Sequence, residues 1–102
     1  MTTLDFPIAK MIEVRRCIHH NPELSNEEYD TQRYVREVLE SADVGPVNDV
    51  ADTGLYVDVI GGLGDGPMIG LRADMDALPI QEATDFEFAS KNPGVMHACG
   101  HD

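Results

Sequence analysis

Basic residues are scarce in this sequence of 102 residues. It has 7 lysines and arginines against 19 acidic residues, and its formal net charge is −12. Such a charge repels phosphate backbones and anionic lipid headgroups, so it argues against a nucleic acid or a membrane surface as a partner. A solvated acidic surface is the simplest explanation of the excess, and attraction of metal ions is the alternative.

Long apolar runs and a basic leader are also missing. The longest apolar runs are far too short to cross a bilayer. Residues 1–9 include Asp5 and Pro7 and do not resemble a signal peptide, so a cytoplasmic location is expected. The only cysteines, Cys17 and Cys99, lie far apart in different contexts, and we expect no structural disulfide. The length suits one small domain, or part of one.

Two helices are predicted in the first half of the chain. Residues 5–19 have Asp5 as a candidate N-cap and four apolar residues at helical spacing, namely Ile8, Met11, Ile12 and Ile18. Pro22 then interrupts the pattern, because proline has no N–H to donate. A second helix is predicted to start at Ser25, which forms a capping box with Glu28, and to end near residues 44–45.

Strands are predicted after the helices. Residues 55–60 alternate as a half-buried strand does, residues 61–66 contain four glycines suited to a turn, and residues 67–73 indicate a second strand. The two strands are predicted to pair as a hairpin. Residues 86–102 have no period and are predicted to be a loop.

A dense group of potential metal ligands occupies this loop, in the motif HACGHD at residues 97–102. Alternate side chains of an extended loop point the same way, so Cys99 and His101 can reach one ion, with His97 on the same side. Thiolate and imidazole suit zinc, manganese or cobalt. Two good ligands do not complete a site, and a polar loop with a buried thiol is an equal alternative.

Two further groups of polar residues are weighed beside this motif. Asp74 and Asp76 follow the second predicted strand, where they are candidate ligands or acceptors that orient an imidazole. A turn capped by acids and neutralised by Arg72 is the simpler explanation and is favoured on spacing alone. His19 and His20 at the end of the first helix are explained by the helix dipole alone.

Three motifs together resemble one known family. They are RRCIHHNPELS at residues 15–25, LRADMDALP at residues 71–79 and GVMHACGHD at residues 94–102, with ADTG at residues 51–54 also fitting. In this order and spacing they resemble the aminoacylase, hippurate hydrolase and auxin-conjugate hydrolase branch of the aminoacylase and carboxypeptidase metallopeptidases. The resemblance covers nearly the whole chain.

The resemblance implies a fold and a metal centre. The expected fold class is α/β: residues 1–102 would be the N-terminal segment of a three-layer, zinc-exopeptidase-like catalytic domain, with two helices followed by the first strands of a mixed sheet. The family's pattern makes Cys99 and His101 ligands of a centre with two divalent ions. It makes Asp76 a supporting acid, with three further supporting candidates, namely Asp74, His97 and Asp102.

The resemblance also implies a reaction, which is hydrolysis of the amide bond of a small N-acyl amino acid. In the family the glutamate that acts as general base follows the motif that ends at Asp102, so we expect the chain to be inactive alone and its metal site to be empty or partly filled. Apolar surface that awaits later strands would then favour self-association. One half of a split hydrolase and a free-standing metal-binding or interaction module are the alternatives.

Overall fold

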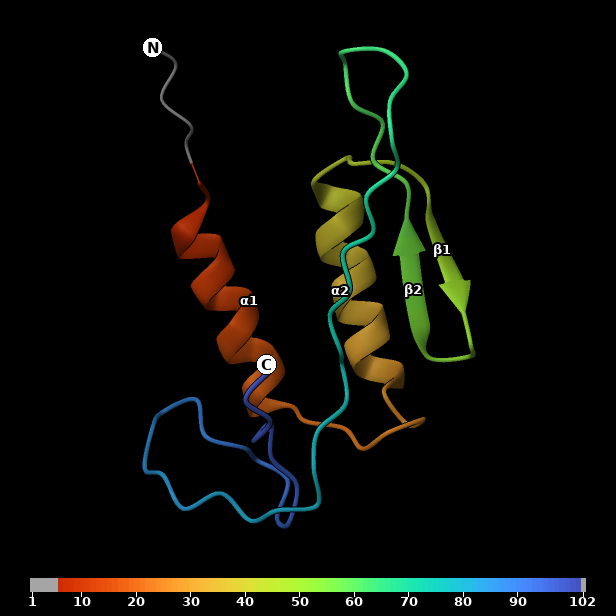
Figure 1. The fold of residues 1–102 in the computed structure, drawn as a ribbon. Helices are drawn as coiled ribbons and strands as arrows, with labels where there is room; N and C mark the ends of the chain where they lie inside the picture. Colours follow the sequence, from red (N-terminus) through yellow and green to blue (C-terminus); the bar gives the residue numbers. More distant parts are fainter. Residues whose placement is uncertain (1–5, 102) are drawn as a thin grey trace.

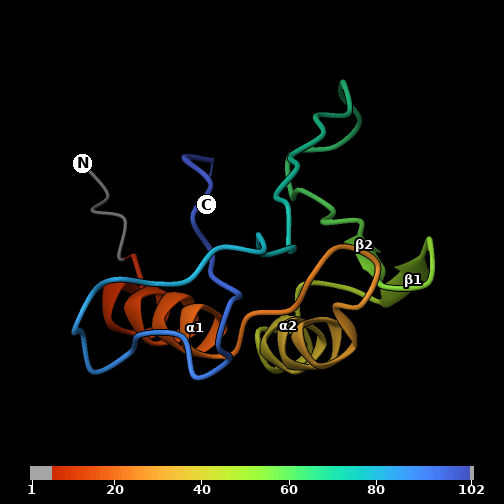
Figure 2. The ribbon, with the colours of Figure 1, turned by 90° about the horizontal axis from the view of Figure 1, so that it is seen from below.

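The computed structural model describes residues 6–101, and its order of elements is two helices followed by two strands. Helix α1 (Ile8–His20) and helix α2 (Tyr29–Ser41) precede strands β1 (Val47–Val50) and β2 (Gly54–Val57). Figures 1 and 2 both place α2 between α1 and the strands. The predicted order of helices and strands is therefore confirmed. No helix in the described range is long and apolar enough to cross a membrane.

Helix α1 matches the first predicted helix to within one residue at its C-terminal end. The proposed cap at Asp5 lies outside the described residues, and Pro7 stands directly before the first helical residue. No residue of α1 is fully buried, and Ile8, Met11 and Ile12 are exposed. The apolar face that the spacing predicted therefore exists but is not covered by the described chain.

Helix α2 begins four residues later than predicted, so the capping box is wrong. Asn26 has a φ of 66°, and this left-handed conformation prevents a helix from running through it. Glu28, the second member of the predicted box, instead lies buried, where it accepts hydrogen bonds from the Asn26 N–H at 2.7 Å and from the Thr53 hydroxyl.

The cap of α2 comes from Glu23, which lies before the turn. Its carboxylate accepts the Asp30 N–H at 3.2 Å, and it accepts both the backbone N–H and the hydroxyl of Thr31. Thr31 is buried at this contact. A carboxylate at a helix N-terminus satisfies N–H groups that have no partner inside the helix and complements the helix dipole.

Replacing Glu23 by alanine is expected to lower the free energy of unfolding by about 1–2 kcal/mol, the usual cost of removing a helix cap. Urea unfolding of the complete protein that contains this chain measures the change. Glu27→Ala is the matched control, because Glu27 is exposed and its side chain makes no hydrogen bond or ion pair with the residues that the structure describes. Equal losses in the two variants would show that Glu23 does not act as the cap.

The hairpin pairs a strand that the pattern predicted with one that it missed. Strand β2 overlaps the predicted strand at 55–60 over residues 55–57, and residues 58–60 are not in a strand. The antiparallel partner of β2 is β1, with Val47 opposite Val57 and Val50 opposite Gly54. The short turn between them closes at little entropic cost. Helix α2 packs on both strands, with its apolar stripe half-buried at Val35, Val38 and Leu39.

The second predicted strand, at 67–73, is wrong as an element of this chain. The segment is irregular and pairs with no other described segment, and large apolar side chains along 63–71 are at least 82% exposed, namely Leu63, Met68, Ile69 and Leu71. A strand needs a neighbouring backbone to receive its hydrogen bonds, and β2 pairs with β1 instead of with this segment. Self-association through this apolar surface stays a prediction.

Candidate functional site

The three motifs of the sequence meet through backbone hydrogen bonds. The Leu78 N–H donates to the Met96 carbonyl at 2.9 Å, and the Met96 N–H donates back to the Leu78 carbonyl at 3.0 Å. The Ala77 N–H donates to the Glu23 carbonyl at 2.7 Å. Ala77 is only 3% exposed at this junction. Motif residues that lie 54 positions apart (Glu23 and Ala77) and 18 positions apart (Leu78 and Met96) are thus tied together around one buried alanine.

A pocket lies where the first motif faces the last. Its volume is about 270 Å³, and its lining residues come from α1 and from the segment after Met96, namely Arg15, His19, His97, Ala98 and Cys99. The His19 and His97 rings lie 6.5 Å apart between centroids. The pocket therefore joins a cationic side chain, two imidazoles and a thiol.

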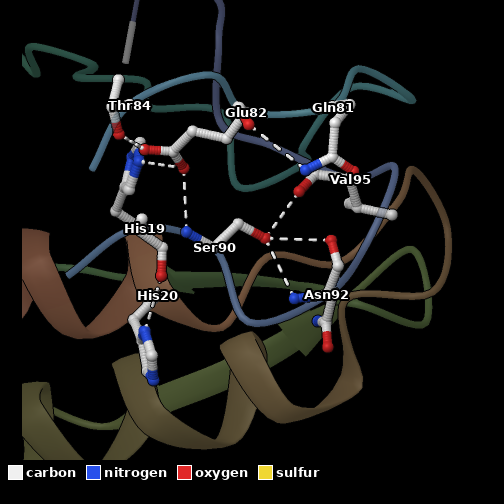
Figure 3. A network of polar contacts seen from close by, with 9 residues as sticks. His19, His20, Gln81, Glu82, Thr84, Ser90, Asn92 and Val95 are labelled. Atoms are coloured by element: carbon white, nitrogen blue, oxygen red, sulfur yellow. Dashed lines mark hydrogen bonds and ion pairs between the residues drawn. The ribbon is translucent and has the colours of Figure 1, made fainter. Parts of the chain in front are cut away.

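Glu82 organises the loop that connects the second and third motifs, as Figure 3 shows. Its side chain is 3% exposed, and its carboxylate contacts His19 Nε2 at 2.9 Å, accepts the Ser90 N–H at 2.8 Å and accepts the Thr84 hydroxyl. A buried carboxylate is stable only where hydrogen bonds or charges replace its water. These three donors meet that need.

The same contacts lower the pKa of the Glu82 carboxyl below its usual value. The hydrogen bond from Thr84 has the largest effect, followed by the Ser90 N–H, while burial opposes both, and the hydrogen bond and charge of His19 add to the lowering. Hydrogen bonds to the ionised form favour ionisation. Glu82 is therefore a carboxylate at neutral pH.

Further bonds hold the loop on the end of α1. His20 Nδ1 lies 2.7 Å from the Ala89 carbonyl oxygen, and the Lys91 N–H donates to the His20 carbonyl at 3.0 Å. Asn92 Nδ2 donates to the Pro22 carbonyl at 2.9 Å. The Ser90 hydroxyl closes the loop by donating to the Val95 carbonyl at 2.6 Å (Figure 3). Residues 82–95 are thus fastened to the first motif at several points.

The structure brings some predicted site residues together and leaves others apart. Cys99 is exposed at the pocket, where half-buried His97 also lies, and His101 is exposed. Asp76 is half-buried two residues before the Leu78 pairing. Asp74 is exposed and forms an ion pair with Arg72 at 3.0 Å. This agrees with the explanation that Arg72 neutralises the acidic residues of the turn. Asp102 lies outside the described residues.

The candidate metal ligands in this chain are of suitable types for a metal centre, but there are too few of them. Within residues 6–101, no three His, Cys, Asp or Glu side chains are grouped so that they could hold an ion. Cys99 and His101 supply a thiol and an imidazole, which suit zinc and related metals, whereas a stable site needs three or four ligands. The described residues therefore do not form a complete metal site by themselves.

Sequence reasoning missed the contribution of Glu82 and explained two histidines too simply. His19 and His20 were assigned to the helix dipole, yet both make side-chain hydrogen bonds to the loop at 82–95. Two adjacent histidines directly before the Asn-Pro pair that ends the helix were the sequence feature that could have indicated these contacts. Nothing in the sequence distinguishes Glu82 from the other acidic residues, because its partners lie up to 63 positions away.

Comparison with known proteins shows which ones this chain is similar to. The model of peptidase family M20/M25/M40 matches residues 70–102. An IAA-amino acid hydrolase of Arabidopsis thaliana is 53% identical over 92 residues, which are 90% of this chain and 21% of that protein. An N-acetyl-L-cysteine deacetylase of Bacillus subtilis is 45% identical, over 91% of this chain and 22% of that protein.

A solved structure supports the same relationship. A Bacillus subtilis protein described as a dinuclear metal binding peptidase of the M20 family superposes with a TM-score of 0.82 at 47% identity, over 91% of this chain and 26% of that chain. The predicted α/β peptidase fold is confirmed by this match. The chain spans about a quarter of the length of the relatives it matches. The resemblance seen in the three motifs is therefore confirmed: the model of peptidase family M20/M25/M40 matches residues 70–102, and the chain is similar to members of that family over nearly all of its own length.

Proposed function

We propose that this chain is the N-terminal segment, residues 1–102, of the catalytic domain of a metal-dependent amidohydrolase that cleaves N-acyl amino acids. The observation that carries the proposal is the junction of the three motifs at Ala77, together with high identity to relatives whose names describe such substrates. An IAA-amino acid and N-acetylcysteine each join an acyl group to an amino acid through an amide. We also keep the cytoplasm as the proposed location.

The proposed metal ligands within this chain are Cys99 and His101. Asp76 is proposed to support them by accepting an imidazole N–H, with Asp74, His97 and Asp102 as further supporting residues. Two divalent ions, zinc, manganese or cobalt, would polarise the amide carbonyl and lower the pKa of a water molecule when bound. The remaining ligands and the general base are proposed to come from residues beyond Asp102.

The exposure of apolar side chains favours this proposal over a free-standing module. Within residues 6–101, Ala77 and Pro22 are the apolar side chains that are buried. Leu63 and Leu71, by contrast, are almost fully exposed. An independent module would need to cover such side chains itself. The same exposure is compatible with one half of a split hydrolase, which requires a second chain to supply the missing groups.

The complete protein that contains this chain is expected to release free amino acid from N-acetyl or N-benzoyl amino acids when zinc, manganese or cobalt is supplied. The isolated 102-residue chain is expected to be at least about 100-fold slower, because a general base alone contributes that much. Chromatography of the released amino acid measures both rates.

Three outcomes distinguish the candidate functions in this assay. Inactivity of the complete protein on all such amides, with each metal, contradicts the proposed reaction. Full turnover by the pure 102-residue chain contradicts the need for groups beyond Asp102. Activity that appears only when a second, separately produced chain is added supports the split hydrolase.

A further inference from the structure

We propose that Glu82 positions the segment that carries the proposed metal ligand Cys99 against helix α1. This inference rests on the proposed function, because it concerns how the metal centre of that function is held in place. Glu82 acts through His19 and through Ser90, so it is a positioning residue.

The first argument is that one oxygen of Glu82 joins two segments that are distant in the sequence (Figure 3). Its Oε1 lies 2.9 Å from His19 Nε2 on α1 and accepts the Ser90 N–H at 2.8 Å, while its Oε2 accepts the Thr84 hydroxyl. Because this carboxyl is ionised at neutral pH and can only accept hydrogen bonds, His19 Nε2 carries a proton. The buried carboxylate therefore holds the imidazole in one orientation.

The second argument is the place of the imidazole that Glu82 holds. The edge of the His19 ring meets the Phe88 ring, with 5.8 Å between the two centroids, and the His97 ring lies 6.5 Å away. His19 lines the pocket of about 270 Å³ that His97 and Cys99 also line. An imidazole fixed by a carboxylate and an aromatic ring thus provides a fixed wall beside residues 97–99.

The third argument is the path from Ser90 to the last motif. The Ser90 hydroxyl donates to the Val95 carbonyl at 2.6 Å, and the next residue, Met96, pairs with Leu78 through two backbone hydrogen bonds. The turn that leads to the last motif is therefore held by Glu82 at its start and by Leu78 at its end. All of these contacts join residues of this chain, so they do not depend on the part of the protein that follows residue 102.

The physical reason for such contacts is the cost of ordering a metal ligand. Cys99 lies on an exposed irregular segment, and fixing a mobile segment when the ion binds opposes the gain from the metal bonds. Ligands that are already held near their bound positions avoid this cost. Contacts that order residues 97–99 before the ion arrives should therefore raise the affinity of the site.

The test compares Glu82→Gln with Glu28→Gln in the complete protein, which is titrated with cobalt in competition with a chelator. Glu28 is the matched control, because it is also a buried carboxylate that accepts a backbone N–H and a threonine hydroxyl, but it joins the start of α2 to the hairpin. Glu82→Gln is expected to raise the dissociation constant of cobalt about 10-fold, the lower end of the range for groups that orient metal ligands. The absorption band of cobalt bound to the Cys99 thiolate is expected to shift as well.

The control separates positioning from a general loss of stability. Glu28→Gln is expected to destabilise the fold by a similar amount and to leave the cobalt affinity and the absorption band near those of the unmodified protein. An unchanged affinity in Glu82→Gln, or an equal loss in both variants, overturns the inference. If Glu82→Gln does not fold, Thr84→Val is compared with Thr53→Val in the same way, since each removes one hydroxyl donor from the corresponding carboxylate.

A measurement without metal separates this inference from the proposed function. If the unmodified protein binds no cobalt, the proposed metal centre fails, and NMR of the metal-free protein then decides the role of Glu82. Loss of the contact between the ring protons of His19 and His97 in Glu82→Gln, but not in Glu28→Gln, supports positioning by Glu82. Persistence of that contact in both variants overturns it.

Discussion

Replacing Cys99 by alanine in the complete protein is expected to lower the bound metal and the rate of amide hydrolysis by at least about 100-fold. Loss of a residue that only supports a metal ligand costs 10- to 100-fold in metal affinity or activity, so loss of a ligand itself costs at least the upper end of that range. His101→Ala is expected to have a similar effect. Elemental analysis of the dialysed protein and an amidase assay measure the two quantities.

Cys17→Ala is the matched control for this experiment. Cys17 is also a free thiol, but it lies on α1 and does not line the pocket of Cys99. Its removal is expected to leave metal content unchanged. If Cys99→Ala likewise retains its metal and its activity, the thiol of Cys99 is structural and the proposed ligand assignment is wrong.

Replacing Glu82 by alanine is expected to release the loop at 82–95 from the end of α1. The change leaves three donors without their shared acceptor, namely His19 Nε2, the Ser90 N–H and the Thr84 hydroxyl. We expect the Ser90 amide to exchange its hydrogen at least about 10-fold faster, as for the loss of one bond to a charged acceptor. Hydrogen exchange followed by NMR or mass spectrometry measures this.

Glu87→Gln is the control for the Glu82 variants, because Glu87 is exposed in the same loop and carries the same charge. In Glu87→Gln, the hydrogen-exchange rate of the Ser90 amide is expected to match that of the unmodified protein. If Glu82→Ala leaves the exchange of the Ser90 amide unchanged, the loop is held by its backbone bonds to His20 and by Asn92 rather than by the carboxylate.

The lowered pKa of Glu82 also predicts the direction of a pH effect. A group whose pKa is lower in the folded state stabilises the fold above its unfolded pKa, near 4.5, and this stabilisation is lost as pH falls through the folded value. The protection of the Ser90 amide should therefore weaken below about pH 4.5. Glu82→Gln should remove that dependence, since glutamine does not titrate in this range.

Most of the order of elements was predictable from local patterns. The helical spacing of apolar residues and the stop at Pro22 placed α1, and the apolar stripe placed α2, because both signals act over a few residues. The alternation after Leu55 located β2 for the same reason. The motifs at residues 15–25, 71–79 and 94–102 together showed the family resemblance, and the structure showed that the last two meet at Leu78 and Met96.

The pairings between distant segments were not predictable in this way. The alternation of apolar and polar residues in a strand does not show which segment pairs with it. For this reason β1 was missed and the segment at 67–73 was paired wrongly. The cap of α2 was predicted from Ser25 by local spacing, whereas Glu23 reaches it across a left-handed turn at Asn26.

By itself, the sequence determined the two helices, the location of β2, the irregular last segment and the family resemblance, because each depends on neighbouring residues or on contiguous motifs. The tertiary structure alone decided that Glu82 is buried against His19 and that Arg15 shares a pocket with Cys99. Both contacts join segments more than 60 residues apart. A charged side chain shows no preference for burial or for one partner until the fold brings that partner within reach and removes the water.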